Sequence, residues 1–92
     1  MSVERETDPV AHRVEGRVHN GSPFRVTDVR LDVRGLDANR RPVGQTFVWA
    51  IGDIASGGQS SFVFEAMPDA VTYHITVVSY HVVSGPPVPQ PR

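Results

Sequence analysis

Apolar and polar residues alternate most clearly in the stretch Val10-Ala11-His12-Arg13-Val14-Glu15-Gly16-Arg17-Val18-His19. Valines and a glycine share one phase of this alternation, whereas arginines and a glutamate occupy the other. A period of two residues is typical of a β-strand with one buried face. No stretch has apolar residues at the spacing i, i+3, i+4, i+7 that an amphipathic helix needs. The pattern therefore predicts an all-β protein.

Composition indicates the same class. The 92 residues include sixteen valines but only two leucines and three isoleucines, and all nine basic side chains are arginine. Valine loses rotamer freedom in a helix and packs well on a pleated sheet. A net charge of -1 with 21% charged residues excludes a strongly basic nucleic-acid binder and an acidic disordered chain. The absence of cysteine excludes disulfides, thiolate nucleophiles and zinc fingers.

The length suits one small domain, which we expect to occupy residues 10–83. Residues 1–9 are rich in charge, so a disordered N-terminal tail is expected there. Residues 84–92 are half proline or glycine and predict a stiff tail or linker, because proline cannot donate to a sheet ladder. No apolar run approaches the roughly 20 residues of a membrane-spanning helix, so we expect no membrane span. The chain as given also lacks the apolar segment of a signal peptide, which leaves localisation open.

Period-two alternation continues through the domain and is interrupted at turn-forming residues. About six or seven short strands of this kind predict a sandwich of two antiparallel sheets. We expect the first two strands to form a hairpin around the turn Asn20-Gly21-Ser22-Pro23. With a β-bulge at Thr27-Asp28, that hairpin places these core residues opposite one another: Val18 and Phe24, Gly16 and Val26, Val14 and Val29, His12 and Leu31, Val10 and Val33.

The same hairpin predicts an arginine-bearing solvent face. Its members are Arg13, Arg17, Arg25, Arg30 and Arg34. Like charges that face one another are unfavourable, so an anionic ligand such as a carboxylate, a phosphate or an acidic polysaccharide would relieve them. The alternative is a solvated face, because Glu15, Asp28 and Asp32 lie among these arginines. Nucleic acid is not expected as a partner, because the net charge is near zero and no aromatic platform is interleaved.

Two later strands carry apolar residues on both faces, where a one-sided sheet would alternate more cleanly. We take as candidate interface residues Phe47, Val48, Trp49, Val78, Tyr80 and Val82. A partner, a loop or another copy of the chain could cover them, or the strands could be central and buried on both faces. The sequence leaves these alternatives and the oligomeric state open.

The residue types of a catalytic or metal site are present without the spacing that such sites need. His12 and His19 are seven residues apart, as are His74 and His81, so each pair splits across two strand faces. For His12, in the core phase, a neutral hydrogen-bonded imidazole is expected. Ser79, His81 and Asp53 supply the types of a hydrolase triad, but no Gly-x-Ser-x-Gly is present. We expect no metal, no cofactor and no enzymatic activity.

Three stretches of the chain resemble the FxLYD domains of bacterial envelope proteins and a similar domain of a zinc-ribbon-associated proteobacterial family. They are Val14-Glu15-Gly16-Arg17-Val18-His19-Asn20, Val29-Arg30-Leu31-Asp32-Val33 with its continuation Leu36-Asp37-Ala38-Asn39-Arg40-Arg41-Pro42-Val43-Gly44, and Ile54-Ala55-Ser56-Gly57-Gly58-Gln59-Ser60-Ser61-Phe62. The signature itself is replaced by Val33-Arg34-Gly35-Leu36-Asp37, and Arg40 stands where a turn glycine is usual.

This resemblance implies an Ig-like, fibronectin-III-like sandwich in the periplasm or cell envelope that acts as a non-catalytic accessory, spacer or protein-interaction module. It implies a protein or envelope component as the partner and supplies no catalytic residues. Gly16 lies in the first matching stretch and is expected to be structural. Asp69-Ala70-Val71-Thr72-Tyr73 also resembles the tyrosine corner of Ig-like domains, in which the hydroxyl returns to the backbone upstream. We therefore expect Tyr73 to be structural as well.

Overall fold

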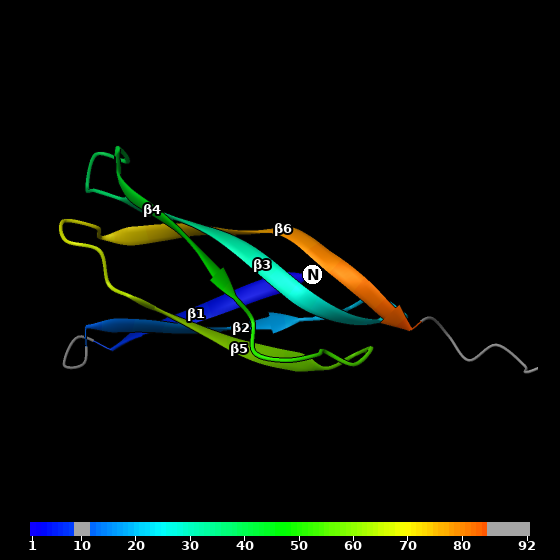
Figure 1. The fold of residues 1–92 in the computed structure, drawn as a ribbon. Helices are drawn as coiled ribbons and strands as arrows, with labels where there is room; N and C mark the ends of the chain where they lie inside the picture. The colour runs from blue at the N-terminus through cyan, green and yellow to red at the C-terminus, as the bar shows by residue number, and fades with distance from the viewer. Residues whose placement is uncertain (9–11, 85–92) are drawn as a thin grey trace, which may run out of the picture.

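Six β-strands build the part of the chain that the computed structural model describes, residues 1–8 and 12–84, and this part contains no helix. The strands are β1 (Ser2–Asp8), β2 (Arg13–His19), β3 (Arg25–Leu36), β4 (Pro42–Trp49), β5 (Gln59–Glu65) and β6 (Thr72–Ser84). They form two antiparallel three-stranded sheets that lie face to face (Figure 1). Sheet A has the order β1-β2-β5 and sheet B the order β4-β3-β6. The predicted all-β class and two-sheet arrangement are confirmed.

The hydrophobic core lies between the two sheets. Its buried members are Val14, Val18, Phe62 and Phe64 from sheet A, Val26, Val29, Leu31 and Val33 from sheet B, and Ala50 and Ile54 between strands. Burying each of the larger side chains contributes about 1.5–3 kcal/mol. Gly16 lies in the same inward phase, and a Cβ there would collide with the ring of Phe62 and the carbonyl of Glu4.

The predicted hairpin between the first two strands is wrong. β2 pairs with β1 and β5, whereas β3 pairs with β4 and β6, so the two strands belong to opposite sheets. Val14 and Val18 therefore enter the core from sheet A, whereas Val26 and Val29 enter it from sheet B, and the two pairs do not lie beside one another on one sheet. Alternation shows which residues point inward, but it is identical for strands that are side by side and for strands that face each other.

The segment expected to be a tight turn is a crossover between sheets, and Asn20 organises it. Its side chain is 1% exposed, and its amide donates to the carbonyls of Phe24 at 2.7 Å and Ile54 at 3.1 Å. Its carbonyl oxygen accepts from the backbone N–H of Ser22 at 3.0 Å. The backbone of Asn20 also pairs with Gly57 and Gly58, so one residue ties together two loops at this end of the sandwich.

β1 corrects the expectation of an N-terminal tail over residues 1–9. Ser2–Asp8 pair in register with β2, with Val3 opposite Val18, and Val3 packs against the core. Arg5 reaches sheet B, where its guanidinium donates to the Thr72 hydroxyl at 3.0 Å. The period-two apolar signal is weak in this strand because Val3 is its one large apolar residue, so its charge content masked it. The Pro-rich segment expected at residues 84–92 lies outside the described residues from 85 onward.

The bulge expected at Thr27-Asp28 is present, although its partner strand is β6. The β3–β6 register shifts between Thr27 and Arg30, and Asp28 has a φ of 52°. A second shift in the same ladder occurs where Leu31 lies opposite Val77 and Arg30 lies opposite Ser79, which leaves Val78 as the extra residue. This second bulge reverses the side-chain alternation of β6 in its later half.

His12 also departs from expectation. It is exposed in the turn before β2 with a φ of 54°, so its imidazole is not in the core. Its predicted neighbour Val10 lies outside the described residues. Within residues 1–8 and 12–84, no helix has the length and apolarity that crossing a bilayer requires.

Candidate functional site

The structure does not bring the five candidate arginines together. Arg13 and Arg17 project from the outer face of sheet A. Arg25, Arg30 and Arg34 belong to β3 in sheet B, on the opposite side of the sandwich. The single arginine-bearing face predicted from the hairpin therefore does not exist, because the hairpin itself does not form.

Acidic side chains accompany the arginines of sheet A. Arg13 lies opposite Glu65 in the ladder, and Arg17 Nη1 is 4.0 Å from Glu4 Oε1. His19 Nε2 lies 3.0 Å from the same Glu4 oxygen. The like-charge contacts that motivated an anionic ligand are thus replaced by contacts between opposite charges.

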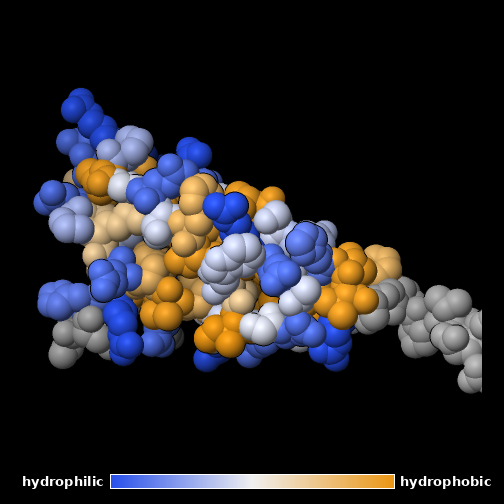
Figure 2. Space-filling model, in the orientation of Figure 1, coloured by the Kyte–Doolittle hydropathy of each residue, from blue (hydrophilic) through white to orange (hydrophobic). Residues whose placement is uncertain are grey.

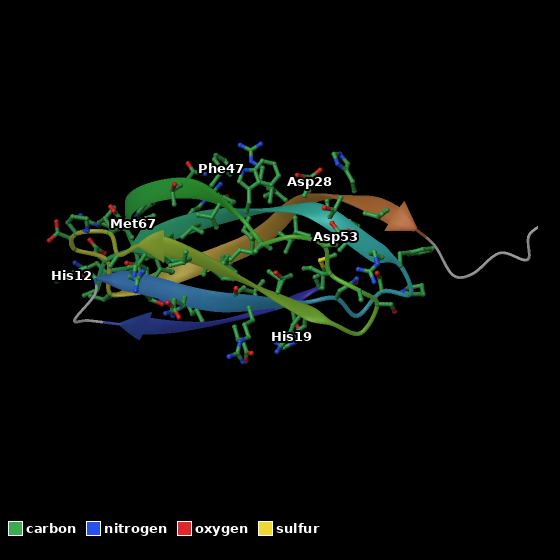
Figure 3. All side chains as sticks on the ribbon, turned by 60° about the horizontal axis from the view of Figure 1, so that its bottom comes forward. His12, His19, Asp28, Phe47, Asp53 and Met67 are labelled. Carbon is green, nitrogen blue, oxygen red and sulfur yellow. The ribbon has the colours of Figure 1, made fainter. Side chains whose placement is uncertain are left out.

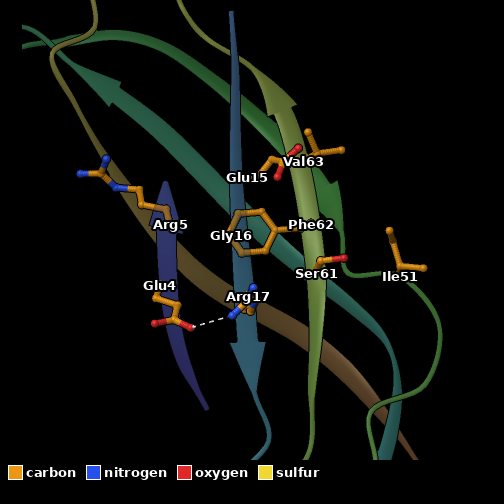
Figure 4. Close-up of a pocket in the computed structure, with 9 residues that line it drawn as sticks. All are labelled: Glu4, Arg5, Glu15, Gly16, Arg17, Ile51, Ser61, Phe62 and Val63. Atoms are coloured by element: carbon orange, nitrogen blue, oxygen red, sulfur yellow. Dashed lines mark ion pairs between the residues drawn. The ribbon is translucent and has the colours of Figure 1, made fainter. Parts of the chain in front are cut away.

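A hollow of about 400 Å³ lies over this part of sheet A (Figure 4). It is lined by Glu4, Arg5, Glu15, Gly16, Arg17, Ile51, Ser61, Phe62 and Val63. Its two arginines are matched by two glutamates, so the lining has no excess of either charge. The hollow therefore offers no concentrated charge for an ionic ligand.

An aromatic pair with a stacked arginine occupies the outer face of sheet B. Phe47 and Trp49 are 47% and 58% exposed, on an edge strand and not a central one. Arg30 lies opposite Trp49 in the ladder, and its Cζ is 4.3 Å from the Phe47 ring centre and 5.9 Å from that of Trp49. Phe47 projects away from sheet A in Figure 3. We call Arg30, Phe47 and Trp49 the aromatic–arginine patch.

Asp32 borders this patch as one of the few buried polar residues. It is 8% exposed and lies opposite Phe47 in the ladder. Its carboxylate accepts from Arg34 Nε at 3.1 Å and from Gln45 Nε2 at 2.8 Å. Both oxygens are thereby paired, which holds Arg34 and Gln45 in place beside the patch.

The other candidate interface residues do not extend the patch. Val48 points inward and packs against the core. Val82 lies opposite the buried Val26, on the side of sheet B that faces sheet A, and period two places Tyr80 on that side too. Because of the bulge at Val78, Tyr80 and Val82 lie on the inner side of sheet B, whereas Phe47 and Trp49 lie on its outer side. The sequence-based prediction had placed all of them in one interface. Val78, Tyr80 and Val82 nevertheless remain 46–54% exposed.

Two of the histidines, His19 and His81, each contact a single carboxylate. His81 Nδ1 lies 3.3 Å from Asp28 Oδ2, which makes Asp28, and not the triad candidate Asp53, its carboxylate partner. Among the described residues, no three His, Cys, Asp or Glu side chains form a group that could hold a metal.

Sequence reasoning missed the stack of Arg30 on the aromatic pair. The signal was present, because Arg30, Asp32 and Arg34 share one phase of β3 and Gln45, Phe47 and Trp49 share one phase of β4. Only the β3–β4 register, which the hairpin hypothesis ignored, brings the two rows together.

Comparison with family models, with curated proteins and with solved structures finds no match to this chain. The site is therefore interpreted from its own chemistry.

Proposed function

We propose that this domain is a non-catalytic protein-interaction module of a bacterial envelope-associated protein, and that the aromatic–arginine patch is its contact surface. The observation that carries the proposal is the exposure of Phe47 and Trp49 with Arg30 stacked on them. Tryptophan and arginine are the residue types most enriched among those that dominate binding energy at protein interfaces. The accessory and envelope roles rest on the resemblance of the matching stretches.

The geometry of the patch suits protein contact. The stacked guanidinium contributes about 0.5–1 kcal/mol where it is exposed to solvent, which restricts the motion of Arg30 before any partner arrives. Asp32 fixes two further hydrogen-bonding side chains at the border. An apolar centre with a polar rim and little flexibility reduces the entropy lost on binding.

We further propose that the sandwich is of the Ig-like type. The support is the contact of Tyr73, whose hydroxyl accepts from the backbone N–H of Met67 at 2.8 Å, six residues upstream. This is the hydrogen bond that a tyrosine corner makes at the start of a late strand.

A receptor for an anionic ligand is the alternative function, and it has less support. It needs several arginines on one surface, whereas Arg13 and Arg17 lie on a different sheet from Arg30 and Arg34. Arg17 and Arg34 already have carboxylate partners.

The test is a titration of isotope-labelled domain with soluble cell-envelope fractions, followed through its amide NMR signals at low and high salt. We expect shifts around residues 30–34 and 45–49 that survive high salt and disappear in Trp49→Ala. Ile51→Ala, at an exposed residue outside the patch, serves as the control.

Two results would contradict the proposal. Shifts confined to Arg13 and Arg17 and abolished by salt would favour the anion receptor. A spectrum unchanged by every fraction would favour a spacer with no contact surface.

A further inference from the structure

β6 has a free edge with an unusual composition. Its sequence, TYHITVVSYHVVS, contains no Asp, Glu, Lys or Arg in thirteen residues. Within the described residues, β3 is its one paired neighbour, so the backbone groups on its other side have no ladder partner. A long uncharged edge of this kind is a template for pairing with another strand.

Of the other three edges of the sandwich, β1 and β4 are protected. β1 includes Glu4, Arg5, Glu6 and Asp8 among seven residues, and charge on an edge strand opposes strand addition. β4 begins at Pro42, and the chain beyond it is tied to β5 where the N–H of Ile51 donates to the carbonyl of Ser61 at 2.9 Å. β5 is a shorter edge of seven residues that includes Glu65, which leaves β6, with thirteen residues, as the longest edge strand without charge.

In the described part of the chain, only the later half of the β6 edge is free of contacts from sheet A. Near its start, Arg5 bonds to Thr72 and lies over the ring of Tyr73, 5.7 Å from its centre. Farther along, β6 runs past β1 towards one end of the sandwich (Figure 1). Apolar side chains are exposed at this end of the molecule (Figure 2), and Val78, Tyr80, Val82 and Val83 are each about half exposed.

The exposed residues form a pattern that is complementary to itself. Val78-Ser79-Tyr80-His81-Val82 has the same apolar residue at each end and an aromatic residue in the middle. In an antiparallel pair of two such strands centred on Tyr80, each Val78 lies opposite Val82 of the other copy and the two tyrosines meet. Aromatic and β-branched pairs of this kind stabilise antiparallel ladders.

We propose that the chain forms a two-fold symmetric dimer in which β6 pairs antiparallel with β6 of a second copy around Tyr80. The two copies of sheet B then join into one continuous sheet, and the exposed row of Val78, Tyr80 and Val82 is covered by its own counterpart. A second copy is the fitting occupant because the row is symmetric and carries no charge that would repel its duplicate. This surface is separate from the aromatic–arginine patch.

The experiment measures molecular mass by light scattering and sedimentation over a wide concentration series. We expect the wild-type chain to shift from monomer to dimer as concentration rises, and the amides of residues 78–83 to exchange more slowly in the dimer. V78K and V82E should each weaken association by about tenfold or more, since each places a charge against an apolar residue of the other copy.

The double variant V78K/V82E identifies the register. In the proposed pairing each new lysine faces a new glutamate of the other copy, twice per dimer, so association should recover relative to either single variant. I51K adds the same charge at an exposed loop residue and should dimerise like the wild type. Circular dichroism of each variant establishes that it is folded.

Three outcomes would overturn the proposal. They are a chain that stays monomeric at every concentration, a dimer that V78K and V82E leave unchanged, and a double variant that associates no better than the singles. If the chain stays monomeric and the amides of residues 78–83 exchange more slowly only after an extended peptide is added, the β6 edge binds a different protein and not a second copy.

Discussion

Two polar side chains, Tyr73 and Asn20, hold loops to strands at opposite ends of the sandwich. Tyr73 accepts from Met67 in the segment before β6, and its ring packs edge-on against Phe64 with the centres 5.1 Å apart. Asn20 joins the crossover after β2 to the loop before β5. Each side chain bonds to loop backbone that the hydrogen bonds of the β-sheets do not hold in place.

Replacing Tyr73 with phenylalanine should lower the free energy of unfolding by about 0.5–1.5 kcal/mol, because the Met67 N–H loses its acceptor while the ring remains. Urea denaturation of Tyr73→Phe and wild type measures the difference. Tyr80→Phe, measured at a concentration where the chain is monomeric, is the matched control, since the Tyr80 side chain is 46% exposed. Equal denaturation midpoints for Tyr73→Phe and wild type would remove the structural role assigned to this hydroxyl.

Asn20→Ala should have a larger effect, lowering the free energy of unfolding by at least about 2 kcal/mol. The reason is that one buried side chain supplies several hydrogen bonds at once, since its amide donates to the carbonyls of Phe24 and Ile54 and its carbonyl oxygen accepts from the N–H of Ser22. Each such bond contributes about 0.5–1.5 kcal/mol, and all of them are lost together. Thermal and urea denaturation test this, with the exposed Asn39→Ala as control. A change no larger than that of Asn39→Ala would contradict the interpretation.

At the scale of elements, the turn between β3 and β4 shows how a strained residue is tolerated. Oδ1 of Asp37 accepts from the backbone N–H of Asn39 at 2.8 Å and of Arg41 at 2.9 Å. Between them Arg40 has a φ of 62°, in the left-handed region that favours glycine. The FxLYD domains that this chain resembles usually have glycine at this turn position.

Arg40→Gly should therefore raise the free energy of unfolding by up to about 1 kcal/mol, because relief of the strain outweighs the added freedom of glycine in the unfolded chain. Arg41→Gly, at a neighbouring residue without positive φ, should not stabilise the domain. Chemical denaturation of both variants gives the comparison, and a destabilised Arg40→Gly would refute the argument.

The strands themselves were largely predictable, and their partners were not. Inward residues such as Val14 and Leu31 follow from alternation, because one face of each strand must leave water. Pairing is a long-range property, and nothing local distinguishes β2 beside β3 from β2 facing β3. The bulge at Val78 does have a sequence signal, because the apolar residues shift at this point from the phase of Ile75 and Val77 to the phase of Tyr80 and Val82. If the strand is assumed to be regular, the same residues indicate two apolar faces, and that assumption hid the bulge.

The wrong strand pairing and the missed bulge also account for the errors in the predicted site. The arginine face failed with the hairpin that defined it, and the proposed interface was divided by the bulge in β6. Phe47 and Trp49 were found because residues 47–51 are apolar in both phases of the strand, and this local property can be seen without knowing the partner strand.

On the scale of the whole molecule, β1 completes sheet A although the sequence predicts a tail there. A chain without residues 1–8 should lose at least about 2 kcal/mol of stability, since it forfeits the packing of Val3, the ladder to β2 and the bond from Arg5 to Thr72.

Thermal denaturation of the shortened and full chains measures this loss. Val3→Asp in the full chain should shift the melting temperature in the same direction, because it places a charge against the core. A shortened chain that melts with the full one would show that β1 contributes nothing to the domain.

The position of β3 in the middle of sheet B also determines when the fold can be completed. Its neighbour β4 follows within a few residues, whereas β6 begins at Thr72, long after β3 ends at Leu36. A chain emerging from the ribosome can form the β3–β4 hairpin early, but one side of β3 stays unpaired until β6 has been synthesised. Nascent chains stalled before Thr72 should therefore be the species that chaperones hold and that aggregates capture.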